Sequence, residues 1–146
     1  MTTQNLQPSL GFTMRRILSA TPEQVFKAFT DPDSYSRWWG PPGCSSTVTQ
    51  LDLEVGGTYR LDMTLPDGTL TGLHGTYREI DPPKLLSYSF QWEGDDLETL
   101  VTVELEPHAE GTELILTHEG FTDQERCDMH EQGWAGSLYR MVEVLA

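Results

Sequence analysis

The stretch HEQGWAGSLYRMVEVLA, residues 130–146, decides the fold because it repeats large apolar side chains at helical spacing. One helix face collects an indole ring and three aliphatic side chains, Trp134, Leu138, Met141 and Leu145. This spacing predicts an amphipathic helix, and we expect Trp134, Leu138 and Met141 to face a sheet. A long helix that closes the chain can cover a curved sheet over either a packed core or a cavity. That difference decides what the protein does.

Upstream of this helix the sequence pattern changes to a period of two, which is typical of strands. Six segments show it: 46–54, 58–65, 69–80, 85–92, 99–107 and 112–119. Short turns such as Gly56-Gly57 connect them, and short connections imply antiparallel pairing. Alternation places apolar and aromatic side chains on one face and polar ones, including Arg60, Ser89 and Gln91, on the other. We therefore predict one sheet with one covered face rather than a two-sheet sandwich.

The first part of the chain carries a strand signal and two helix starts. Residues 10–19 alternate loosely and predict a first strand. Residues 21–24, Thr-Pro-Glu-Gln, form a capping box with proline at the first helical position, and Asp31-Pro32 begins a second short helix. Residues 40–43, Gly-Pro-Pro-Gly, then stop helical structure. For the last helix we predict a start after Phe121 with Thr122 as the N-cap.

Composition limits the partners. The chain has 146 residues, which fits a flexible N-terminus, 1–8, followed by a single domain, 9–146. Asp and Glu number 23 against 9 Lys and Arg, and the net charge of -14 argues against nucleic-acid and membrane partners. Cys44 and Cys127 make no disulfide framework, and the N-terminus lacks a secretory signal, so we expect a cytoplasmic protein. No apolar run reaches the roughly 18 residues of a spanning helix, so we also expect solubility.

The sequence shows no catalytic constellation and no metal site. The four histidines lack zinc-type spacing, and there is no G-x-S-x-G motif around a serine. We therefore predict no catalytic residue, no metal and no cofactor. His118 is the histidine of most interest, because alternation places it on the apolar face near the last helix. A hydrogen-bonded histidine in the core or at a cavity rim is favoured over a general acid or base.

Aromatic content is the remaining functional signal. A bent sheet that grips a single helix leaves space that one helix cannot fill, and small-molecule sites are mostly apolar pockets with few polar groups. We predict a cavity beneath the last helix that binds a small apolar molecule. The predicted ligand-binding residues are Trp38, Tyr59, Leu61, Tyr88, Phe90, Trp92, Val103, His118, Trp134 and Leu138.

Several stretches, taken in order, resemble one known family. They are TPEQVF (21–26), WWGP (38–41), GGTY (56–59), HGTYREIDPP (74–83), GTEL (111–114) with THEGF (117–121), and HxxGW (130–134). Together they resemble the activator of heat-shock-protein-90 ATPase homologue-like domain of the SRPBCC (START-like) superfamily, over about residues 12–145. The resemblance implies an α+β protein with the helix-grip (START-like) fold: a curved antiparallel sheet wrapped around a long C-terminal helix, with two short helices after the first strand.

The resemblance leaves three functions open. The first is binding of a hydrophobic ligand, aromatic or polycyclic, between sheet and helix. The second is a protein-interaction module related to chaperone ATPase activators; these carry a separate chaperone-binding domain for which the chain has no room, which makes a chaperone partner doubtful. The third is a cyclase- or hydrolase-type enzyme that uses His118 or His74. A hollow cavity favours the first and third. Ligand identity, catalysis and oligomeric state, a homodimer included, stay open.

Overall fold

The computed structural model describes residues 10–40 and 43–146. The N-terminal segment 1–8, predicted to be flexible, and the Pro41-Pro42 part of the predicted helix stop lie outside these ranges. None of the helices in the described ranges combines the length and apolarity needed to cross a bilayer.

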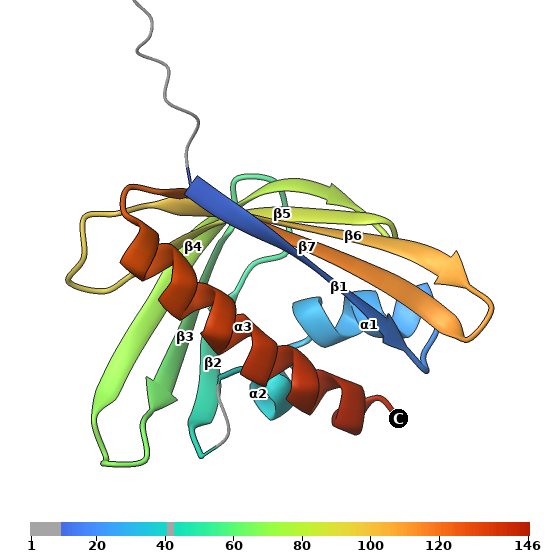
Figure 1. Cartoon of the computed structure of the whole chain (residues 1–146), viewed down its shortest axis with the longest axis horizontal. Coiled ribbons are helices and arrows are strands. Elements are labelled where there is room, and N and C mark those ends of the chain that lie inside the picture. Colours follow the sequence, from blue (N-terminus) through green and yellow to red (C-terminus); the bar gives the residue numbers. More distant parts are fainter. Residues whose placement is uncertain (1–9, 41–42) are drawn as a thin grey trace, which may run out of the picture.

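The molecule is built on one antiparallel sheet that curves around the last helix (Figure 1). The sheet order is β1-β7-β6-β5-β4-β3-β2, so the first strand pairs with the last. Its strands are β1 Leu10–Leu18, β2 Ser45–Leu51, β3 Thr58–Thr64, β4 Leu70–Asp81, β5 Leu85–Trp92, β6 Thr99–His108 and β7 Gly111–Phe121. The helices are α1 Pro22–Thr30, α2 Pro32–Trp38 and α3 Gln124–Val144. All the predicted elements are present, and the single-sheet prediction is confirmed.

The helix starts follow the capping chemistry of the sequence, with one exception. At α1 the Thr21 hydroxyl accepts a hydrogen bond from the Gln24 backbone N–H, and the Gln24 side chain accepts from the Thr21 N–H, which is the predicted capping box. At α3 the prediction of Thr122 as N-cap is wrong. Asp123 is the cap: its backbone is extended, and its carboxylate accepts from the Arg126 N–H at 2.8 Å.

The covered face of α3 is the predicted one. Trp134, Leu138 and Met141 are buried, whereas Tyr139 on the other side of the helix is 62% exposed. The Trp134 ring lies against the sheet, with its centroid 6.3 Å from that of Phe90 on β5. Spacing alone was therefore enough to orient this helix.

The inner face of the sheet is also as predicted, but two side chains expected on the open face are buried. Tyr59, Tyr88, Phe90 and Val103 are buried, and Trp92 is partly buried. Ser87 and Ser89, expected on the open face, are buried too. Strands β4 and β5 approach closely there, because a Cβ on Gly75 would collide with the Ser89 carbonyl oxygen. The Ser89 hydroxyl accepts the Thr76 backbone N–H at 2.8 Å and thereby replaces a strand-to-strand bond.

Helix α3 also binds the segment that follows α2. The Arg140 guanidinium donates to the backbone carbonyls of Arg37, Trp39 and Gly40, each at 3.0 Å. The Ser137 hydroxyl accepts the Gly40 backbone N–H at 2.9 Å. A cation on the last carbonyls of a helix complements their partial negative charge. Arg140 and Ser137 therefore fix the position of Trp39 and Gly40 beside α3.

Replacing Arg140 by Met is expected to lower the free energy of unfolding by about 2 to 3 kcal/mol, because the apolar stem stays while charge-assisted hydrogen bonds are lost. Arg126→Met on the same helix is the control. Arg126 pairs with Asp95 at 3.2 Å on the surface, and exposed pairs contribute about 1 kcal/mol or less. Urea unfolding of both variants measures the difference. Equal losses in the two variants would contradict the role of Arg140.

Candidate functional site

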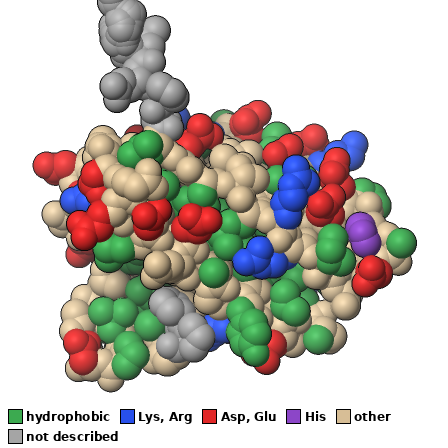
Figure 2. Space-filling view, viewed as in Figure 1, with side chains coloured by type: hydrophobic (Ala, Val, Ile, Leu, Met, Phe, Trp, Pro, Cys, Tyr) green, Lys and Arg blue, Asp and Glu red, His purple; other side chains and the backbone are tan. Residues whose placement is uncertain are grey.

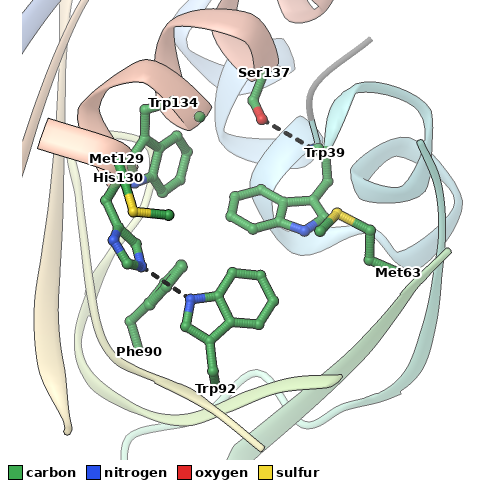
Figure 3. A pocket seen from close by; sticks show the side chains of 10 residues that line it. Trp39, Met63, Phe90, Trp92, Met129, His130, Trp134 and Ser137 are labelled. Carbon is green, nitrogen blue, oxygen red and sulfur yellow. Dashed lines mark hydrogen bonds between the residues drawn. The ribbon is translucent and has the colours of Figure 1, made fainter. Parts of the chain in front are cut away.

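A cavity of about 240 Å³ lies between α3 and the sheet (Figure 3). Its walls come from α3, from β3 and β5, and from the segment that follows α2. The lining residues are Trp39, Gly40, Met63, Phe90, Trp92, Met129, His130, Gly133, Trp134 and Ser137. Aromatic rings and methionine side chains surround the space, so the site is mainly apolar and suits a small apolar molecule.

The structure brings three of the ten predicted ligand-binding residues into this cavity, Phe90, Trp92 and Trp134. The other seven do not line it. They are buried in the packed core: Trp38, Tyr59, Leu61, Tyr88, Val103, His118 and Leu138. The aromatic members of this set pack on other rings; the ring centroids of Tyr59 and Tyr88, for example, are 5.3 Å apart. The cavity is therefore at one end of the concave face, and the middle of that face is filled.

Sequence reasoning missed most of the α3 wall. Met129, Gly133 and Ser137 recur at four-residue spacing, so they share a face that adjoins the buried stripe. That spacing indicates the wall, but the larger side chains of the Trp134 stripe dominate the sequence pattern. Trp39 and Met63 complete the opposite wall.

His118 is a fully buried structural group. Since an indole N–H can only donate, Trp134 donates to His118 Nδ1, at 3.0 Å, and Nε2 carries the proton. Nε2–H then donates to the Thr99 hydroxyl at 2.7 Å, and that hydroxyl donates to the Phe90 carbonyl at 2.9 Å. Burial, with a smaller effect of the nearby His130 ring, lowers the pKa of His118 to about 3. Both ring nitrogens are bonded, so His118 is not placed to transfer protons.

His130 makes a second indole–imidazole pair, at the cavity wall. Trp92 Nε1–H donates to His130 Nε2 at 2.9 Å, as the dashed line in Figure 3 marks, and the opposite nitrogen, Nδ1, donates to the Arg126 carbonyl at 2.8 Å. Burial lowers the pKa of His130. Both histidines are therefore neutral near pH 7, and among the described residues none that lines the cavity is charged.

Charge lies on the outside of the molecule. Asp and Glu side chains are spread over the face shown in Figure 2, in keeping with the net charge of -14. Within residues 10–40 and 43–146, no three His, Cys, Asp or Glu side chains are close enough together to hold a metal ion. What the arrangement can do is enclose an uncharged molecule in an aromatic pocket.

A curved antiparallel sheet that grips one long helix, with an apolar cavity between them, defines the class of helix-grip domains. The family model of "Activator of Hsp90 ATPase homolog 1-like protein" matches residues 19–146. The chain therefore belongs to this family, and the resemblance read from the sequence motifs is confirmed.

Solved structures agree with this assignment. A protein from Chromobacterium violaceum is 28% identical, with a TM-score of 0.86 over 92% of this chain and 96% of that one. The AHSA1 protein from Silicibacter pomeroyi is 28% identical, with a TM-score of 0.82 over 93% and 97%. A protein from Arthrobacter aurescens is 28% identical, with a TM-score of 0.84 over 93% and 86%. A comparison with curated protein sequences finds no match.

Proposed function

We propose that the protein binds a small apolar molecule in the cavity between α3 and the sheet. The observation that carries the proposal is Gly133. This glycine lies in the interior of α3 and lines the cavity. Apart from its chain neighbours and the adjacent backbone of α3, a Cβ built on it would meet no atom of the described residues within 4 Å. Glycine inside a helix costs about 1 kcal/mol relative to alanine. Here neither neighbouring atoms nor a positive φ require it, so its effect is to leave the cavity open at a cost in stability.

Gly133→Ala is therefore expected to raise the free energy of unfolding by about 0.5 to 1 kcal/mol, through helix propensity alone. Gly75→Ala is the opposite control, since its Cβ would collide with the Ser89 backbone, and it should destabilise the fold. Urea unfolding measures both. A destabilised Gly133→Ala variant would mean that the space beside α3 is not free.

Binding is tested by the thermal stability of the wild type in the presence of small aromatic compounds. A compound at 100 times its dissociation constant should add roughly 2.7 kcal/mol. Gly133→Leu places a side chain in the cavity while keeping a good helix former, so this variant should fold and lose the response. If no compound stabilises the wild type, the proposal fails. If Gly133→Leu responds equally, the compound binds elsewhere and the cavity is not the site.

The enzyme alternative has no support from His118, whose two nitrogens are bonded to Trp134 and Thr99. General acid–base catalysis requires a nitrogen that reaches the substrate. Ligand binding rather than catalysis by His118 is therefore the proposed function.

A further inference from the structure

The side of the cavity that solvent reaches lies between the end of β5 and the N-terminal half of α3. Six of the described lining residues are buried: Trp39, Gly40, Met63, Phe90, Trp134 and Ser137. Trp92, His130 and Gly133 are partly exposed, and Met129 is 64% exposed. A molecule that enters the cavity while the core stays packed therefore passes these four residues, which we call the entrance.

Trp92 and His130 are joined to each other at the entrance. The indole Nε1–H of Trp92 donates to His130 Nε2 at 2.9 Å (Figure 3). On the opposite side of the imidazole, Nδ1–H donates to the Arg126 carbonyl of α3 at 2.8 Å. Strand β5 ends at Trp92, so this pair ties the last residue of a strand to the helix. His130 thereby fixes the position of an aromatic ring that forms part of the cavity wall.

The hydrogen bond from Trp92 requires a neutral imidazole. An indole N–H can only donate, and a protonated histidine carries a hydrogen on each nitrogen. Protonation at Nε2 would therefore set two donors against each other at 2.9 Å. The bond from Nδ1 to the Arg126 carbonyl survives protonation and becomes stronger, because its donor then carries charge. The imidazole stays in place, and Trp92 has to turn away.

The groups around His130 keep it neutral at pH 7. Burial has the largest effect and lowers its pKa, while the bond to the Arg126 carbonyl acts in the opposite direction. The charges of Arg126 and Asp95 oppose each other and form an ion pair at 3.2 Å. From β5 and β7, the described rings packed on His130 are uncharged: Phe90, Trp92, Phe121 and the neutral His118. Because His130 is partly exposed, water can solvate the imidazolium once Trp92 has turned away.

We propose that His130 is a positioning residue of the binding site: its neutral form holds Trp92 at the entrance, and its protonation between about pH 7 and pH 5 releases Trp92 and weakens the binding of an apolar ligand. This inference rests on the proposed function, because it concerns the ligand of the same cavity. A charged imidazolium in the wall also opposes an apolar occupant, since the occupant would remove water from the charge. By linkage, a bound ligand makes His130 harder to protonate.

Naphthalene is the probe, because it has no titratable group and a cavity of about 150 Å³ already holds benzene. The cavity here measures about 240 Å³. Its dissociation constant is measured from pH 7.5 to pH 5, while imidazole spectra follow the titration of His130 and circular dichroism checks the fold. If only the neutral form binds, the dissociation constant doubles at the pKa of His130 and rises about tenfold per pH unit below it.

His130→Gln separates positioning from charge. Glutamine keeps an acceptor for Trp92 and cannot gain a proton, so this variant should bind naphthalene with an affinity that does not change over the same pH range. His130→Leu removes the acceptor and should bind more weakly at every pH. His74→Gln is the control: His74 lies on β4 outside the cavity lining, and this variant should keep the pH dependence of the wild type.

Two further measurements use the titration of His130 itself. Trp92→Phe keeps a ring and removes the N–H, so the pKa of His130 should rise by about 0.5 to 1. In the wild type, saturation with naphthalene should lower the pKa of His130.

The outcomes separate the inference from the proposed function. If naphthalene binds but its affinity is constant from pH 7.5 to pH 5, or if His130 stays neutral throughout, the inference is overturned and the proposed function stands. Equal pH dependence in the wild type and His130→Gln would overturn it as well. If neither naphthalene nor any other small aromatic compound binds the wild type at pH 7.5, the proposed function fails and the inference fails with it.

Discussion

Trp134→Ala is expected to lower the free energy of unfolding by about 4 to 5 kcal/mol, the upper part of the range for truncating a buried aromatic residue. The ring is 2% exposed, and its centroid lies 5.0 Å from that of Trp39 and 6.2 Å from that of Trp38. Its N–H also satisfies His118 Nδ1, which the alanine variant leaves buried without a donor. Urea unfolding at pH 7.5, with coincident fluorescence and circular-dichroism transitions, gives the value.

Tyr139→Ala provides the matched control, because it removes an aromatic ring from the same helix. Tyr139 is 62% exposed, so its loss should cost less than about 1 kcal/mol. Trp134→Phe should fall between the two variants, since it keeps a ring but removes the donor to His118. A cost below about 1.5 kcal/mol for Trp134→Ala would contradict the prediction, because it would show that packing against Trp38 and Trp39 contributes little to stability.

The elements of the fold could be predicted because local patterns determine them. Apolar side chains that recur every two residues predict the strands, and those that recur about every 3.6 residues predict α3. The capping box at Thr21 predicts the start of α1. The prediction of Thr122 as the cap of α3 was wrong, because the neighbouring Asp123 can also cap and the backbone conformation decides which residue does. Ser89 failed for a different reason: its burial depends on the close approach of two strands at Gly75.

The candidate site was predicted only in part, because α3 does not cover the sheet alone. Helix α2 packs against β2 and α3, and its Tyr35 side chain lies close enough to interact with Tyr88. This helix helps to fill the middle of the concave face, where Tyr59 and Tyr88 were expected to bind a ligand. Periodicity identifies which side chains point inward, but it does not say which gaps a second element fills.

Acid is expected to destabilise the protein through His118. Its pKa is 6.5 when unperturbed and about 3 in the folded state, because burial disfavours the charged imidazolium. Between these values the unfolded chain binds a proton that the folded chain does not, so stability falls as pH falls. The stability that depends on a neutral His118 is fully present above pH 6.5 and is lost progressively as the pH falls toward 3. The loss is about 2 kcal/mol by pH 5 and about 4 to 5 kcal/mol near pH 3.

A non-titrating variant isolates this contribution from that of the carboxylates. His118→Gln removes the ionisable group and retains one donor and one acceptor. Between pH 7 and pH 5, the wild type should lose about 2 kcal/mol more of its free energy of unfolding than His118→Gln does. Over this interval most carboxylates stay ionised, and their remaining effect is common to both proteins.

The charge state of His118 can also be observed directly. Nitrogen-15 spectra of the imidazole should show a neutral ring with the proton on Nε2 at pH 5, because Nδ1 accepts from Trp134 and Nε2 donates to Thr99. A protonated ring would carry hydrogens on both nitrogens and would face the Trp134 N–H with another donor. Titration of His118 near pH 6.5 in the folded protein would therefore contradict both the tautomer and the stability argument. A neutral ring at pH 5 would instead agree with a folded-state pKa well below 6.5, as burial of His118 requires.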